Sequence, residues 1–409
     1  MANTLLTTQE ITFETLMILK NTLKFAANVN RGYDSQFGVR GHKIGATLNI
    51  RKPPRFVGRV GQGVKIEGLT DTFVPLVLNT QAGVDFEASS SEMLLSIDDF
   101  RNRYLLAAAA NIANRIDRDG LVMAYQNTWN QVGVAGTAPT ALLTYLQAGQ
   151  YLDQNGCPDD DRRTMIINPA SRVAIVDALK TLFQDSSSIS SQYKKGKMGT
   201  AAGFEWYQDQ NVVPHTIGTV VGTPIVSGAG QTGSTLTVSG FTAGDTLNVG
   251  DIITLGSTTA NTVYSVNPQS RANNPTAAQF VITAPFVAAG GTESIQIAPP
   301  MIPSSQFQNI SASPANSLAI NLWPGTTSPS GKVTPQNIGF HENAFTMASV
   351  ELEVPGGIDL GYSARDKETG VALRFIRQYV ATTDQWISRF DVLYGWAPLY
   401  PELAVRVAS

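Results

Sequence analysis

The chain is poor in cysteine, in histidine and in charged side chains. Its 409 residues include one cysteine, Cys157, and three histidines, and only 15% of the residues are charged, against roughly 25% in an ordinary soluble domain. A lone cysteine excludes an intrachain disulfide and a Cys-x-x-Cys metal or redox site. The formal net charge of −3 excludes a chain that binds nucleic acid through an overall cationic excess.

Long apolar runs and a secretory signal are absent as well. The closest approach to a membrane span, residues 105–110, stops at Asn111, far short of the roughly 18 apolar residues that a spanning helix needs. Glu10 and Glu14 precede the first basic residue, Lys20, whereas a signal peptide carries its cations ahead of the apolar run. We therefore expect no membrane span, and synthesis in the cytosol.

Motifs for catalysis or cofactor binding are weak. Residues 228–233 have Gly-x-Gly-x-x-Gly spacing, but residues 234–238 continue as a strand pattern, where a phosphate site needs the start of a helix. His42, His215 and His341 form no His-x-x-x-His pair, the spacing that places two metal ligands on one helix face. We therefore expect no enzyme activity, no cofactor and no metal site.

Helical periodicity is strongest near residue 110. Apolar residues recur there at intervals of three or four and predict one helix over residues 96–128, roughly 50 Å long. Similar patterns predict helices over residues 9–29 and 140–155. Another is predicted to begin at Pro169, with Asn168 as its cap. The long helix resembles a spine on which other elements lie.

Charge is segregated in the segment between the first two helices. Residues 31–65 hold eight basic residues and one acidic residue, and residues 66–100 hold seven acidic residues and no basic one. Strand-like segments at 47–51 and 73–78 flank a tip rich in glycine and proline, which predicts a protruding hairpin.

Two explanations of this segregation remain open. The two arms neutralise each other within one chain, or the basic arm meets an acidic patch on a neighbouring copy, where complementary charge sets the register. We favour contact between copies and expect it at these side chains: Arg51, Lys52, Arg55, Arg59, Lys65, Glu67 and Asp71. Phosphate binding by the arginines is less favoured because aromatic residues for base stacking are scarce here.

Residues 219–337 differ from the rest of the chain. They contain five charged residues, and short β-type runs recur between Gly, Pro and Asn turns. This pattern predicts an inserted small β-barrel or sandwich. The more charged pattern resumes after it, so the main domain is expected to be discontinuous, with residues 133–218 and 338–409 folding together.

The order of these parts resembles the major capsid protein of tailed bacteriophages, which has the Hong Kong 97-like fold. Matching stretches occur in order: Asp98-Asp99-Phe100, then residues 166–169, 203–207 and 341–345. Within the insertion, residues 249–252 resemble the short-tailed-phage coat branch, which carries an insertion domain. The resemblance implies an α+β chain with an N-terminal helical arm (1–37), an extended β-hairpin loop (38–88), a spine helix (89–132), a discontinuous α/β axial domain (133–218 and 338–409) and an inserted barrel (219–337).

The resemblance also implies a function. It implies self-assembly into hexamers and pentamers of an icosahedral phage head that encloses double-stranded DNA without sequence-specific binding. Scaffolding protein and portal are the implied partners, and the implied locations are the host cytoplasm during assembly and then the virion. The alternative is a non-viral β-rich surface or adhesion protein, supported by the low-charge insertion and weakened by the missing signal. An oxidoreductase using the glycine motif has almost no support.

Overall fold

The chain folds as two compact units. The computed structural model describes residues 8–33, 45, 47–59, 61–64, 66–68, 70–89, 104–179, 200–256, 262–323, 330–366 and 369–409. Unit 1 consists of Met1–Arg51, Phe73–Gly120 and Phe345–Leu399, and unit 2 of Lys52–Thr72, Leu121–Ala344 and Tyr400–Ser409. Among the described residues, no helix combines the length and the apolar character that crossing a bilayer requires.

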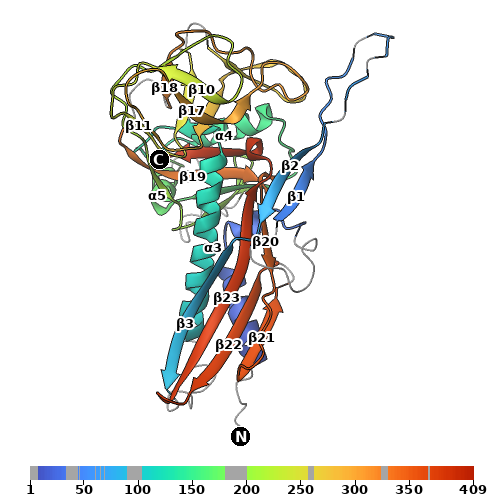
Figure 1. Ribbon diagram of the computed structural model, residues 1–409, viewed down its shortest axis with the longest axis vertical. Coiled ribbons are helices and arrows are strands. Elements are labelled where there is room, and N and C mark those ends of the chain that lie inside the picture. Colours follow the sequence, from blue (N-terminus) through green and yellow to red (C-terminus); the bar gives the residue numbers. More distant parts are fainter. Residues whose placement is uncertain are drawn as a thin grey trace. The chain divides into compact units, whose positions relative to one another are not determined.

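Unit 1 is built on an antiparallel sheet of five strands (Figure 1). Its strands are β20 (Phe345–Val350), β23 (Gln385–Pro398), β22 (Ala372–Val380), β21 (Leu360–Arg365) and β3 (Thr80–Ser89). The longest pairing joins β3 to β23, from Thr80 opposite Tyr394 to Ser89 opposite Gln385. Residues 80–88, expected in the extended loop, therefore belong to this sheet, because they pair with a strand some three hundred positions later.

The first helix of unit 1, α1 (Thr8–Thr22), ends earlier than predicted. The carboxylate of Asp117 accepts hydrogen bonds from the backbone N–H of Lys24 at 2.7 Å and of Ala26 at 2.9 Å. These donors would bond to carbonyls one turn back if the helix continued. The chain instead forms a short 3₁₀ helix, Ala26–Asn28.

The long helix α3 runs over Leu106–Asn127, after a π-helical turn at Tyr104 and Leu105. Its predicted beginning, residues 96–103, lies outside the described residues. Gly120 is a point of close approach on this helix. A Cβ atom there would lie 2.6 Å from Trp396 Cζ2 and 2.7 Å from Phe25 Cδ1.

Unit 2 contains a seven-stranded mixed sheet. Its strands are β4 (Gln131–Gly133), β24 (Ala404–Ala408), β19 (Val333–His341), β5 (Arg163–Ile167), β7 (Phe204–Gln208) and β6 (Thr200–Ala201), with β8 (Pro214–Thr216) paired to β19. Helices α4 (Leu142–Gln154) and α5 (Pro169–Leu179) confirm the predicted helical segments. The side chain of Asn168 caps α5 by accepting the N–H of Ser171 at 2.9 Å. The core against α4 includes Tyr145, Met165, Trp206 and Val405.

The late strands divide between the two units, which differs from the expectation that residues 338–409 fold with 133–218. Strand β19 pairs with β5 and β24. Strand β20 follows β19 after one 3₁₀ turn, Glu342–Ala344, and pairs with β23 of unit 1. Strand β20 belongs to unit 1 because its partner β23 also pairs with β3 and β22 of that unit.

The low-charge segment, residues 219–337, forms a second sheet in unit 2. Its strand order is β18 (Ile320–Leu322), β12 (Ile252–Leu255), β15 (Gln279–Ile282), β17 (Glu293–Met301), β10 (Gly233–Ser239) and β9 (Ile225–Val226). Two further pairs are β11 (Thr246–Leu247) with β16 (Phe286–Val287), and β13 (Tyr264–Val266) with β14 (Asn273–Ala277). Strand β10 confirms that a strand, and not a helix, follows the glycine motif. The two end strands approach each other, since Val226 N–H donates to Leu318 O at 2.8 Å and Ile320 N–H to Pro224 O at 2.9 Å.

We predict that Gly120→Ala lowers the free energy of unfolding by disturbing the packing against α3. Alanine favours a helix over glycine by about 1 kcal/mol, but the new methyl group would overlap two aromatic rings, which costs about 1–3 kcal/mol. Gly149→Ala in α4 is the matched control, because its Cβ would meet only Phe204 Cε2 at 3.8 Å. Urea unfolding of the unassembled chain should show a lower free energy for Gly120→Ala and an equal or higher one for Gly149→Ala. An equal increase in the free energy of unfolding in both variants would contradict the close approach of Trp396 and Phe25 to Gly120.

Candidate assembly surface

The predicted hairpin is present. Strands β1 (Thr47–Lys52) and β2 (Thr72–Val77) pair as a separate two-stranded sheet, in line with the predicted arms. The side chains of Ile50 and Leu76 are buried. The arms are thus anchored, and residues 53–71 form the loop between them.

The beginning of this loop contacts a distant turn of the same unit, the 3₁₀ helix Pro401–Leu403 and its preceding residue. Arg55 forms an ion pair of 2.9 Å with Glu402, and both side chains are partly buried. The ammonium of Lys52 lies 4.9 Å from the ring centroid of Tyr400. Burial lowers the pKa of Lys52, as does the charge of Arg55, while Glu402 acts in the opposite direction.

The next residues of the loop are held through backbone groups. Arg271 donates to the carbonyl of Phe56 at 3.4 Å, and to the carbonyls of Ser305 and Gln306 at 2.6 Å each. The carboxylate of Glu67 accepts the N–H of Val57 at 2.7 Å. Glu67 therefore joins the two sides of the loop.

Three other predicted contact residues, Arg51, Arg59 and Asp71, are exposed. Arg51 lies over the ring of Phe73, 5.6 Å from its centroid, and Arg59 donates to the carbonyl of Gly61. Lys65 lies outside the described residues. The structure thus brings Lys52 and Arg55 to the 400–403 turn, a partner that neither explanation of the charge pattern had named.

The loop carries apolar side chains that are exposed to solvent. Val64 is 85% exposed and Ile66 91%, and Phe56 and Val57 are about half exposed. Single exposed apolar residues are ordinary, but a group of them on one protruding segment indicates an interaction site. Sequence reasoning missed this group, although the recurrence of Val and Ile between glycines in residues 57–66 was a usable signal.

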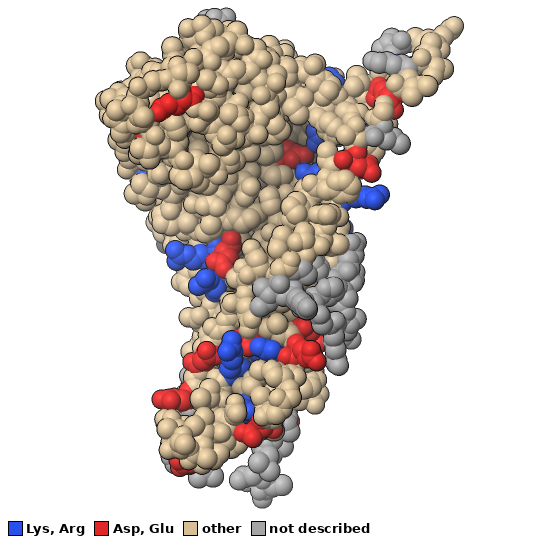
Figure 2. Space-filling model, viewed as in Figure 1, with Lys and Arg blue, Asp and Glu red and all other residues tan. Residues whose placement is uncertain are grey.

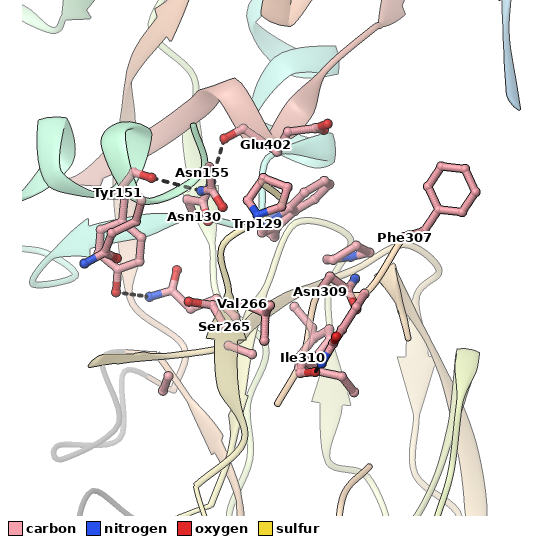
Figure 3. Close-up of a pocket in the computed structure, with 18 of the residues that line it drawn as sticks. Trp129, Asn130, Tyr151, Asn155, Ser265, Val266, Phe307, Asn309, Ile310 and Glu402 are labelled. Atoms are coloured by element: carbon pink, nitrogen blue, oxygen red, sulfur yellow. Dashed lines mark hydrogen bonds between the residues drawn. The ribbon is translucent and has the colours of Figure 1, made fainter. Parts of the chain in front are cut away.

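A cavity of about 140 Å³ lies in unit 2, and both Arg55 and Glu402 line it. Figure 3 shows Tyr151 and Asn130 on one side of it and Asn309 and Ile310 on the other. Its polar groups are engaged by the fold, since Gln279 donates to the Tyr151 hydroxyl at 3.2 Å and Asn130 to the Glu402 carbonyl at 3.3 Å. Burial raises the pKa of Tyr151 to about 12, so this hydroxyl stays neutral and offers no base.

A buried charged cluster joins three segments of unit 2. The guanidinium of Arg406 on β24 is fully buried and donates to the carbonyls of Tyr125 at 3.1 Å and Gly250 at 2.9 Å. Burial lowers the pKa of Arg406 to about 9, while the nearby carboxylate of Asp251 favours its charge. Asp251 in turn accepts from His215 Nε2 at 2.7 Å and from the backbone N–H groups of Gly218 and Asn248.

The family model of the P22 coat protein, gene protein 5, matches residues 19–407. The chain belongs to the P22 coat protein family. It is therefore a phage coat protein, a structural major capsid protein of the virion, and the adhesion alternative is not favoured. This confirms the resemblance stated from the sequence.

Solved structures similar to this coat protein are distant. That of Mycobacterium phage Che8 has 13% identity and a TM-score of 0.45, covering 94% of this chain and 90% of the other. The capsid of Ralstonia phage GP4 has 7% identity and a TM-score of 0.43, covering 94% and 88%. Because these values are low, the assignment rests on the family match. No curated protein matches the chain.

The family points to a structural, non-enzymatic role for this coat protein. Both described histidines are buried and bond to a carboxylate: His215 to the buried Asp251, and His341 Nε2 at 3.0 Å to the exposed Asp160. His42 lies outside the described residues. Burial raises the pKa of the Cys157 thiol to about 11. Within the described ranges, no three His, Cys, Asp or Glu side chains are grouped so as to hold a metal.

We predict that Asp251→Asn destabilises this coat protein more than Asp245→Asn does. Both carboxylates are buried, and Asp245 accepts the backbone N–H groups of Val221, Gly222 and Thr242. Only Asp251 also compensates a buried cation, whose loss of a partner costs about 3–5 kcal/mol. Lost hydrogen bonds alone account for about 1–3 kcal/mol. Urea unfolding should separate the variants, and equal losses would show that Arg406 does not depend on Asp251.

Proposed function

We propose that this coat protein forms the hexamers and pentamers of an icosahedral head with the Hong Kong 97-like fold. In this proposal α1 is the N-terminal arm, the β1–β2 hairpin is the extended loop, α3 is the spine helix and the seven-stranded sheet is the core of the axial domain. The observation that carries the proposal is the loop tip, where the apolar side chains of Val64 and Ile66 are almost fully exposed among the described residues. A second copy of the chain supplies the missing surface.

We further propose that residues 219–337 are the inserted barrel of the short-tailed-phage coat branch. The hydrogen bonds between the end strands β9 and β18 support closure of the six-stranded sheet. An apolar interior that includes Leu236, Phe280 and Ile295 supports it too. The face of this segment seen in Figure 2 is almost free of charged side chains, in agreement with its content of only five charged residues.

The energetics of the loop fit a shell made of many weak contacts. Burying one Val or Ile side chain stabilises by about 1.5–3 kcal/mol. One tip therefore gives a modest contact, and the repetition of that contact around closed rings gives a stable shell. The exposed charges of Arg51, Arg59 and Asp71 would set the register of the contact, because complementary charge contributes specificity more than affinity.

The remaining partners follow from the family resemblance. Scaffolding protein would guide the size of a precursor shell in the host cytoplasm, and double-stranded DNA would enter through a portal. The net charge of −3 supports a container that is filled by a motor, because a wall that condensed DNA by itself would need a cationic excess.

We predict that the purified chain, expressed with and without its scaffold, forms closed shells, tubes or capsomers that negative-stain electron microscopy detects. Scaffold is expected to narrow the size distribution, since it acts on curvature. A chain that stays monomeric at high concentration in both conditions would refute the proposed function.

We predict that the double variant Val64→Ser, Ile66→Ser folds normally and assembles poorly. Both side chains are exposed in the subunit, so their loss leaves the free energy of unfolding nearly unchanged. The matched control, Val64→Leu with Ile66→Leu, keeps the apolar surface and should assemble. Sedimentation velocity measures the assembled fraction, and urea unfolding measures the fold. Normal shells from the serine variant would rule out the tip as a contact.

A further inference from the structure

We propose that Lys52 and Arg55 position the extended loop by fastening it to the 400–403 turn of their own chain, and that they do not contact neighbouring copies. This inference rests on the proposed function, in which the loop presents its tip to a second copy. It assigns Arg55 and Lys52 a role different from the contact role expected of Arg51 and Arg59.

The two cations stand at the ends of a stiff segment, Lys52-Pro53-Pro54-Arg55. Proline fixes φ near −65° and has no N–H donor, so a Pro-Pro pair is an extended spacer with few conformations. Because Lys52 contacts Tyr400 and Arg55 contacts Glu402, the whole segment is held at both ends. Its direction is thereby fixed.

The turn on the other side of these contacts is itself rigid. Pro401 is buried, the N–H of Tyr400 donates to Ala344 O at 2.9 Å, and the carbonyl of Glu402 accepts from Asn130. A charged pair contributes more when its partners are already ordered, since less side-chain entropy is lost on forming it. The turn therefore serves as an anchor for the loop.

Glycines follow the fastened segment. Arg271 holds the carbonyl of Phe56, and the next residues include Gly58 and Gly61, whose φ values are +77° and +99°. Glycine adopts such angles without strain, and other residues rarely do. The loop thus has a fixed base, residues 52–56, followed by glycines at which the tip can adjust to different neighbours.

Reversing the charges of Arg55 and Glu402, singly and together, tests this inference in the unassembled full chain. Arg55→Glu and Glu402→Arg should each speed amide hydrogen exchange in residues 52–59 by about tenfold, because each leaves like charges opposed at the base. The double variant restores the pair with opposite polarity and should return exchange to within about twofold of the wild type. Arg59→Glu makes the same charge change beyond the base and is the matched control, expected to leave residues 52–56 unchanged.

Assembly of the same variants gives a second measurement. The single variants should form fewer or misshapen shells, the double variant should recover them, and Arg55→Lys, which keeps the charge, should be mildly affected. Far-UV circular dichroism checks that each variant folds. Unchanged exchange in both single variants, or no recovery in the double variant, would overturn the inference. If wild type itself forms no shells, the proposed function fails, while the exchange measurement on the subunit still decides whether the loop is fastened.

Discussion

The burial of one guanidinium constrains how unit 2 folds. Arg406 has no exposed surface, and a buried charge without compensation costs several kcal/mol. The end of α3, the turn before β12 and strand β24 must therefore assemble around it together, since Tyr125, Gly250 and Asp251 supply the compensating oxygens and charge. Strand β24 also pairs with β4 and β19, so the same residue couples the turn at Gly250 to the seven-stranded sheet.

Buried polar groups fix the subunit, and apolar surface is left over for assembly. In unit 1 the Asp117 carboxylate ends α1 and holds the 3₁₀ turn, much as Asp245 holds the turns of the insertion. These contacts are directional and tolerate no neighbour of a different shape. The loop offers surface of the opposite kind, because its apolar side chains are exposed and apolar burial is non-directional. In the proposed shell, such surface suits contacts between copies in more than one geometry.

The sequence was informative where the deciding contacts are local. The asparagine cap of α5, the extent of α4 and the strand after the glycine motif depend on residues within a few positions of each other. The hairpin arms were recognised from the strand-like pattern of each arm, although residues 53–71 separate them. The end of α1 could not be predicted, because its cause, Asp117, lies more than ninety positions away. The partners of Lys52 and Arg55, almost 350 positions later, and the pairing of β3 with β23 were hidden for the same reason.

The charge pattern of the loop has a different meaning once these partners are known. Eight basic residues in residues 31–65 suggested a uniform cationic arm, but Lys52 is partly buried against a ring and Arg55 is paired within the chain. A cation already compensated by its own chain has little left to offer a neighbour, since breaking the first pair offsets the gain from the second. In the proposed assembly, contact between copies therefore falls to the other side chains of the loop, where exposed apolar surface would supply the affinity and exposed charges would supply the register.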